Sequence, residues 1–449
     1  MATLLEGYAA YGAREALATP APEVLHHAKR AVVDWFSTLY PGTRVAPATN
    51  LVAAHARELG VGRSSLPGFA TTAFPALAAW INGAASHAVE FDDIFKDGAY
   101  HPGCPTIAGA LAMAEDAGAS GAAFLDAVIV GYEVSTRIAA AVQPSHYRYF
   151  HTTGTAGVFG SAAAGAAILA PGDATAMGHA LATAGTFASG LQQAFRSDSH
   201  TKPLHAGHAA QVGVLAARAA ASGVTGALDL LEGEAGFGAA LSDGGKWDRA
   251  LDGLGRDYNI ARMTQKNHGC CGHTFAPVDG ILALRAQGLG AQDVERIEVE
   301  SYRATLDVCG NTDPKTAAEA RFSAPYVVAH ALLHGAVRLE AFSDERLADP
   351  GVRALMKRVV LREDAGFTAA FPGRRQARVR VVTKAGRTLE HYAPCRKGDP
   401  EAPLTDAEID DKSRELVTPV LGEARARGLL AQLWRLETLT LADLKLASA

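Results

Sequence analysis

The chain has 449 residues, of which 48% are apolar and 20% are charged, and its formal net charge at pH 7 is −5. This length favours two domains over a single core, and the apolar fraction excludes a disordered chain. The acidic balance excludes the basic surface that nucleic acids or anionic membranes require, so we expect neither partner. We see no leader segment and no apolar run of membrane-spanning length, and therefore predict a soluble, cytoplasmic protein.

Several enzyme classes lack their characteristic motifs. The five cysteines include no Cys-x-x-Cys pair, which argues against a disulfide framework, a zinc knuckle and an iron–sulfur cluster. The sequence also contains no Gly-x-Ser-x-Gly elbow, no phosphate-binding loop, no dinucleotide-binding turn and no His-Glu-x-x-His motif. We therefore expect chemistry that needs no nucleotide cofactor.

Residues 1–262 are rich in Ala, Leu and Gly and show helical periodicity. The helices expected here are apolar around much of their circumference, so they should be buried against one another. We find no strand pattern in this region and predict a helical bundle. The expected helices, in chain order, are Pro22–Tyr40, Pro75–Ala88, Thr106–Ala117, Ala122–Val142, Ala156–Leu169, Ala174–Ala188 and Leu204–Ser222.

The pattern changes near Arg262, and residues 263–398 are predicted to form a smaller α+β domain. Expected strands are Val294–Glu300, a weaker Arg358–Arg362, and a hairpin of Gln376–Thr383 with Arg387–Tyr392; expected helices are Ala276–Gln287 and Ser323–Leu333. Residues 399–449 return to helical periodicity, mainly over Asp406–Leu446, and are predicted to rejoin the bundle. The predicted fold is mainly α, with a large, discontinuous helical domain.

The most informative polar segment contains His87, Glu90, Asp92, Asp93 and His101 between apolar helices. Such a cluster is costly beside a core unless its groups are paired or used. One interpretation is a hard-cation site formed by Asp92, Asp93 and His101, although no ligand template is matched. A second is a solvated helix end with a capping Asp. A third is acid–base chemistry.

Two further polar segments precede or open helices. Residues 146–157 place His151 at a helix start, where free backbone N–H groups favour an anion. Residues 192–208 contain Arg196, Lys202 and three histidines, including His205. This cationic density suits a substrate with several carboxylates. The alternatives are an ordinary capping region for the first segment and a solvated loop for the second.

A fourth polar segment, residues 266–274, lies at the expected domain boundary and contains Lys266, Cys270, Cys271 and His273. Clefts between domains are preferred sites for small ligands. A cysteine thiolate activated by His273 is one interpretation, and a boundary loop with hydrogen-bonded histidines is another.

Six motifs in chain order make the sequence similar to the MmgE/PrpD family. That family includes 2-methylcitrate dehydratase, cis-aconitate decarboxylase and iminodisuccinate epimerase, which share one scaffold. The motifs are His87–Asp93 with His101–Pro105, Gly131–Ile138, His151–Gly160, Thr201–Ala210, Lys266–Gly280 and Phe322–Gly335.

The resemblance implies a discontinuous helical domain with an inserted α+β lid domain, a homodimer, and a metal-free active site in the cleft between the domains. The chain departs from the family pattern Asp–Phe–Asp–Asp–Thr, because Glu90 and Ile94 stand at its ends, and residues 194–198 also differ. The site residues implied are an acid at Glu90, Asp92 or Asp93, together with His101, His151, Lys202, His273 and Tyr326.

These residues suggest one mechanism. Dehydration, decarboxylation and epimerisation all require carbanion character next to a carboxylate, which cations and hydrogen-bond donors must stabilise. Our hypothesis is that Lys202, with Arg196 or Lys266, binds substrate carboxylates and that the acidic group orients His101. Either His101 or His151 then moves the proton at carbon, and the other histidine or Tyr326 protonates a departing hydroxyl.

We expect first a lyase that dehydrates a 2-methylcitrate-like hydroxy-polycarboxylate. The alternatives are an epimerase of an iminodisuccinate-like dicarboxylate and a decarboxylase of the cis-aconitate type. A protein that only binds a polycarboxylate is the alternative outside enzymes. The expected partners are thus a small di- or tricarboxylate and a second copy of the chain, with no metal or other cofactor.

Overall fold

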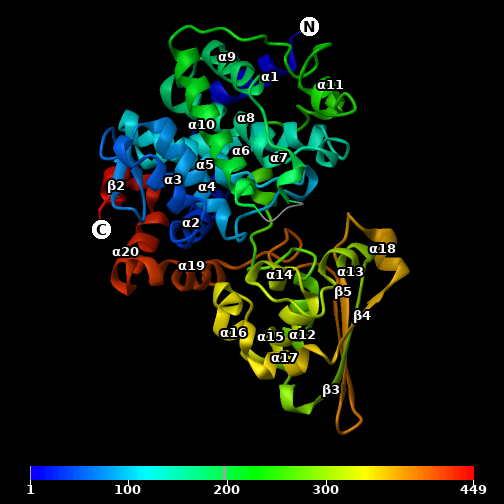
Figure 1. The fold of residues 1–449 in the computed structure, drawn as a ribbon. Coiled ribbons are helices and arrows are strands. Elements are labelled where there is room, and N and C mark those ends of the chain that lie inside the picture. The colour runs from blue at the N-terminus through cyan, green and yellow to red at the C-terminus, as the bar shows by residue number, and fades with distance from the viewer. Residues whose placement is uncertain (1, 196–198, 449) are drawn as a thin grey trace. The chain divides into compact units, whose positions relative to one another are not determined.

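A computed structural model describes residues 2–195 and 199–448, and the chain forms two compact units (Figure 1). The larger unit comprises the residues up to Thr264 together with those from Thr405 onward, and the smaller unit is Gln265–Leu404. The expected boundaries were 262/263 and 398/399. The C-terminal segment returns to the larger unit, where Lys412 forms a buried ion pair with Asp34 at 2.6 Å.

The larger unit is almost entirely helical. Ala and Gly are frequent at its helix contacts, as in Gly157–Ala167, where every residue is buried. Its helices are α1 (Leu4–Glu15), α2 (Pro22–Gly42), α3 (Ala48–Ala54), α4 (Pro75–Ala88), α5 (Gly103–Ala117), α6 (Gly121–Ala141), α7 (Thr152–Thr155), α8 (Gly157–Leu169), α9 (Ala174–Gly185), α10 (Thr201–Ala221), α11 (Phe237–Leu241), α19 (Asp406–Leu421) and α20 (Glu423–Leu433).

Two sequence-based expectations about this region are wrong. Strands β1 (Ser64–Leu66) and β2 (Thr71–Ala73) pair antiparallel, although no strand was expected before residue 262. Strands of three residues are too short to show alternation, which explains the omission. The second expectation was that no apolar run has membrane-spanning length. The window Thr152–Leu169 is long and apolar enough to cross a membrane by length and composition, but 89% of it is buried inside the structure. The core helix of a globular protein passes the same test.

Close contact between α4 and α10 positions the polar residues at their ends. A Cβ at Gly83 would lie 2.9 Å from the Cα of Gly207, and a Cβ at Gly207 would lie 2.3 Å from the carbonyl oxygen of Trp80. Only glycine permits this backbone approach. The end of α4, which carries His87, and the first turns of α10, which carry Lys202, belong to these two packed helices.

The smaller unit combines a four-stranded sheet with short helices. The strand order is β4-β3-β5-β6, in which β3 is parallel to β4 and antiparallel to β5. The strands are β3 (Val294–Ser301), β4 (Val359–Glu363), β5 (Ala377–Thr383) and β6 (Thr388–Ala393). The helices are α12 (Phe275–Ala286), α13 (Arg303–Cys309), α14 (Ala317–Arg321), α15 (Ala324–His334), α16 (Asp344–Ala348), α17 (Pro350–Met356) and α18 (Ala365–Ala370).

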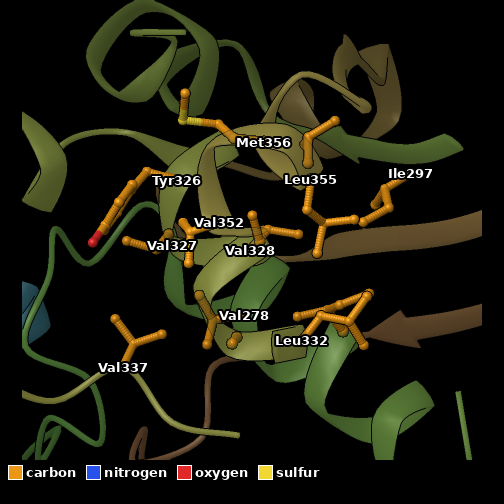
Figure 2. Packing of buried hydrophobic residues seen from close by; sticks show 14 of the residues in the cluster. Val278, Ile297, Tyr326, Val327, Val328, Leu332, Val337, Val352, Leu355 and Met356 are labelled. Carbon is orange, nitrogen blue, oxygen red and sulfur yellow. The ribbon is translucent and has the colours of Figure 1, made fainter. Parts of the chain in front are cut away.

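The core of the smaller unit lies between its sheet and helices α12, α15 and α17. Side chains alternate along β5, where Ala377, Val379 and Val381 are buried and the intervening residues are partly exposed. Figure 2 shows Val278, Val328 and Leu332 among the side chains that fill this core. The predicted hairpin, the weaker strand near residue 360 and both predicted helices are present within one to two residues.

Candidate active site

A cluster of imidazoles and carboxylates lies in the larger unit where α4 ends and α5, α7 and α10 begin. Between α4 and α5 the chain bends at Glu90, which has a φ of 57°. Backbone hydrogen bonds between Ile94 and Thr264 (2.9 and 2.8 Å) fix one part of this connection. The Nζ of Lys412 fixes another by donating to the carbonyl of Phe91 at 2.9 Å. The connection is thus held by contacts with sequence-distant residues.

Asp92 is the centre of this cluster. Its Oδ2 lies 2.8 Å from Nδ1 of His87, 2.9 Å from Nδ1 of His101 and 3.1 Å from Sγ of Cys104. Nδ1 of His101 also lies 2.8 Å from the carbonyl oxygen of Asp93. Since both partners of Nδ1 are acceptors, they hold the proton of His101 on Nδ1 and leave Nε2 as the ring nitrogen for chemistry.

Asp93 has a different role from Asp92. Its carboxylate accepts hydrogen bonds from the Tyr132 hydroxyl (2.8 Å) and the Gly103 amide (3.1 Å). Burial raises the pKa of Asp93 to about 7, and the charges of Asp34 and Asp92 add to the effect. A side chain at position 103 would meet Asp93 Oδ1 at 2.9 Å, so glycine is needed there. Asp93 therefore anchors the start of α5 and contacts His101 through its backbone.

Histidines 151 and 205 form a second pair beside the first. Their Nδ1 atoms are 3.1 Å apart, and the ring of His151 stacks on that of His87 with centroids 5.5 Å apart. Burial lowers the pKa of His151 well below its usual value, and the neighbouring His87 and Lys202 lower it further. Burial likewise lowers the pKa of His205 to about 4. Both rings are therefore neutral at pH 7.

Lys202 on α10 forms an ion pair with Glu90. Burial opposes the charge of Lys202, but the Glu90 carboxylate outweighs it and raises the pKa of the lysine. The ammonium therefore stays charged and is already paired with a carboxylate. A substrate carboxylate bound by Lys202 would have to share it with Glu90.

The other predicted site residues lie in the smaller unit or outside the described residues. Lys266 and His273 lie in the smaller unit, where Nδ1 of His273 is 2.9 Å from the Tyr302 hydroxyl. Arg196 is not among the described residues. The Tyr326 hydroxyl donates to the carbonyl of Ala341 at 2.5 Å, and the side chain is fully buried in the hydrophobic core. The proton-donor role expected for Tyr326 stays a prediction, and in this structure its hydroxyl is engaged by a backbone carbonyl.

Two residues of the Asp92 cluster were not selected from the sequence. His87 belongs to the first polar segment but lies on α4, five residues before Asp92, and the bend at Glu90 lies between the two. Cys104 is a lone cysteine at a helix start, and its buried thiol carries a pKa raised by burial and by Asp92. Donor atoms of His87, Asp92 and Cys104 lie within 4.8 Å of one another, close enough to hold a cation.

Comparisons with known proteins match both halves of the chain. The MmgE/PrpD N-terminal domain matches residues 7–250, and the MmgE/PrpD C-terminal domain matches residues 268–436. The cis-aconitate decarboxylase-like protein oryM of Aspergillus oryzae is 26% identical over 93% of this chain and 91% of its own length. Human cis-aconitate decarboxylase is 28% identical over 81% of this chain and 77% of its own length. The mouse protein of the same name is 26% identical over 93% and 87%.

Proposed function

Since this chain belongs to the MmgE/PrpD family, we propose that it is a lyase for a di- or tricarboxylate which moves a proton at a carbon next to a carboxylate. The observation that carries the proposal is the pairing of His101 with Asp92 beside the neutral imidazole of His151. The two ring centroids are 6.4 Å apart. Two neighbouring imidazoles with different electrostatic surroundings support a proton transfer on one small molecule.

The two histidines suit opposite proton-transfer roles. A carboxylate next to an imidazole favours its protonated form, so Asp92 suits His101 to donate a proton from Nε2. Burial and neighbouring cationic groups keep His151 neutral, which suits it to accept one. Two titratable groups can act as an acid and a base when their surroundings shift their pKa values in opposite directions. We therefore assign His101 as the acid and His151 as the base.

Lys202 supplies the positive charge that the reaction requires. A carbanion next to a carboxylate resembles an enolate, and a buried cation stabilises it more than water does. In the free enzyme the Glu90 carboxylate pairs with Lys202 and raises the pKa of the lysine, and a bound substrate carboxylate has the same effect on the ammonium. In the proposed complex the ammonium contacts a substrate carboxylate while it remains next to Glu90.

As the first candidate reaction we propose decarboxylation of an unsaturated tricarboxylate such as cis-aconitate. The support comes from relatives named cis-aconitate decarboxylase or cis-aconitate decarboxylase-like protein, which align with most of this chain. When carbon dioxide leaves a carbon next to a C=C bond, the electron pair of the broken C–C bond forms a new double bond. The original double bond then takes a proton at its far carbon, and we assign the supply of that proton to His101.

Dehydration of a 2-methylcitrate-like hydroxy acid is the second candidate. In this reaction a base removes a proton from carbon, the C–H electron pair forms the double bond, and an acid protonates the hydroxyl that leaves as water. The acid–base pair of His101 and His151 supports it because dehydration uses both roles at once.

The experiment is incubation of the purified enzyme with cis-aconitate, 2-methylcitrate and simple dicarboxylates in deuterium oxide. Released carbon dioxide supports decarboxylation, and rising ultraviolet absorbance from a new alkene supports dehydration. Deuterium exchange with a change in optical rotation would instead indicate an epimerase. Tight binding of these acids without turnover across the whole panel would contradict the proposal and favour a binding protein.

The cytoplasmic location and the homodimer stay predictions. Sedimentation analysis of the purified chain tests the second directly, since one species at twice the monomer mass is expected.

A further inference from the structure

In the smaller unit, Arg375 forms no ion pair with any described residue. It follows α18 and precedes β5 in the chain, and its Nε is buried without a hydrogen-bond partner among the described residues. Among the described residues, no carboxylate lies within ion-pair distance of its guanidinium. Arg378 and Arg396 differ in this respect, since Arg378 pairs with Glu300 at 2.9 Å and Arg396 with Asp399 at 2.6 Å.

Aromatic and polar side chains surround this guanidinium. Its Cζ lies 5.8 Å from the ring centroid of Phe371. Tyr302 stacks on the same ring at 4.7 Å, and the ring of His273 lies 5.8 Å from it. Nδ1 of His273 is 2.9 Å from the Tyr302 hydroxyl. Arg375, His273 and Tyr302 are thus gathered around one phenyl ring.

The group offers positive charge and hydrogen-bond donors but no negative charge of its own. Burial lowers the pKa of His273 to about 4, and the charges of Arg375 and Arg396 contribute, so the imidazole is neutral at pH 7. Burial raises the pKa of Tyr302 to about 12, so its hydroxyl keeps its proton. Asp399 is engaged by Arg396 through two hydrogen bonds, at 2.9 and 2.6 Å.

We infer that Arg375, together with His273 and Tyr302, forms a binding site for a carboxylate. An arginine cannot lose its proton in a protein, so a partly desolvated guanidinium is stabilised when an anion joins it. Its planar fork matches a carboxylate with two parallel hydrogen bonds. The hydrogen bond between His273 and Tyr302 uses one of their two protons, so the pair supplies one further donor. The inference rests on the proposed function in one respect, namely that the carboxylate belongs to the substrate or product. Phosphate shares the charge and the acceptor oxygens, so the test includes it.

The test is isothermal titration of the full-length enzyme with citrate, with succinate and with inorganic phosphate at low ionic strength. Arg375→Met removes the charge at nearly constant length, and we expect its dissociation constant for the carboxylates to rise about tenfold or more, the loss expected for a hydrogen bond to a charged group. Arg374→Met is the matched control, because Arg374 is the preceding residue and is exposed. It should bind as the wild type does. Arg375→Lys keeps the charge without the fork and should recover part of the affinity.

The outcomes separate this inference from the proposed function. If Arg375→Met binds the carboxylates as tightly as the wild type, the site is wrong, whatever the turnover assays show. If only phosphate binding depends on Arg375, the assignment to carboxylates is wrong. If the wild type binds citrate through Arg375 but turns over no acid, the carboxylate site stands and the proposed reaction fails. Should the methionine variant not fold, the lysine variant replaces it, and unchanged affinity there would overturn the site.

Discussion

The Nδ1 atom of His87 lies 2.8 Å from Oδ2 of Asp92, and both side chains are buried. The same oxygen lies 2.9 Å from Nδ1 of His101, so one carboxylate oxygen joins the two imidazoles. Nε2 of His87 is buried without a hydrogen-bond partner among the described residues. His87 therefore contributes through the hydrogen bond that it donates to Asp92, and in this account it positions the carboxylate that orients His101.

Replacing His87 tests this positioning role. His87→Phe keeps a ring but removes the donor, and we expect kcat to fall about tenfold to a hundredfold, the equivalent of one hydrogen bond to a charged group. His87→Asn places an amide N–H near the position of Nδ1 and should lose less. His55→Phe is the control, since it removes another 2.8 Å contact between Nδ1 and a carboxylate, to Glu58. Equal losses in the Phe and Asn variants would argue against a role through the donor.

Because Glu90 and Lys202 form an ion pair, replacing one or the other should change substrate binding in opposite directions. Lys202→Met removes the cation, so KM for the acid should rise and kcat should fall. Glu90→Gln removes the competing carboxylate, so KM should fall several-fold. Steady-state kinetics of the two variants and the wild type provide the comparison. A rise in KM for both variants would show that Glu90 helps to bind the substrate instead of competing with it.

The raised pKa of Asp93 predicts a stability that falls as pH rises. Its pKa is 3.8 in the reference state and about 7 in the folded protein, so between these values the folded state binds more protons than the unfolded state. The free energy of unfolding should then decrease by at most about 1.4 kcal/mol per pH unit from this group. Asp93→Asn lacks the titration, so its stability relative to the wild type should be higher at pH 8 than at pH 4.

Urea unfolding at several pH values measures this difference. Glu115→Gln serves for comparison, because burial also raises the pKa of Glu115 to about 7 and Ser65 is its hydrogen-bond partner. Glu115→Gln should also make the free energy of unfolding fall less steeply as pH rises. Wild-type and Asp93→Asn curves that stay parallel from pH 4 to pH 8 would contradict the assignment.

Chelation tests whether the cluster of His87, Asp92 and Cys104 holds a metal ion. We expect EDTA to leave the activity unchanged, because Oδ2 of Asp92 is engaged by two ring nitrogens and a thiol at hydrogen-bond distances. Metal analysis of the purified protein complements the assay. Activity that disappears with EDTA and returns with a divalent cation would contradict a metal-free reaction.

The sequence predicts the helices of this fold better than its contacts. Helix Pro75–Ala88 is found at the predicted residues because proline starts it and a continuous apolar face runs to its end. The short strands at Ser64–Leu66 and Thr71–Ala73 were missed because their pairing depends on surroundings outside the local pattern. Periodicity identifies an element when the element is long enough to repeat.

The candidate site shows the same limit. Asp92, His101, His151 and Lys202 were selected from motif resemblance, and the structure brings them together in one unit. The hydrogen-bond and ion-pair partners of these four side chains were not predictable from the sequence. Glu90 adopts a left-handed backbone conformation that no local pattern indicates. It lies between His87 and Asp92, which contact each other, and its own side chain pairs with Lys202.

The buried side chains show why residue type alone misleads. Tyr326 resembles a proton donor in the sequence, but its hydroxyl is used by the Ala341 carbonyl within a hydrophobic core. Cys104 resembles a small core residue, yet its thiol contacts Asp92. In both cases the role of the side chain depends on a hydrogen-bond partner at least 12 residues away in the sequence.

We propose that His101 and His151 transfer the protons in a lyase reaction. The most direct test is kcat/KM of His101→Ala and His151→Ala on the acid that the wild type converts, with folding checked by circular dichroism. We predict that each variant loses a factor of about 10²–10⁴, the usual contribution of a proton-transfer group. Near-wild-type turnover in both folded variants would contradict the account.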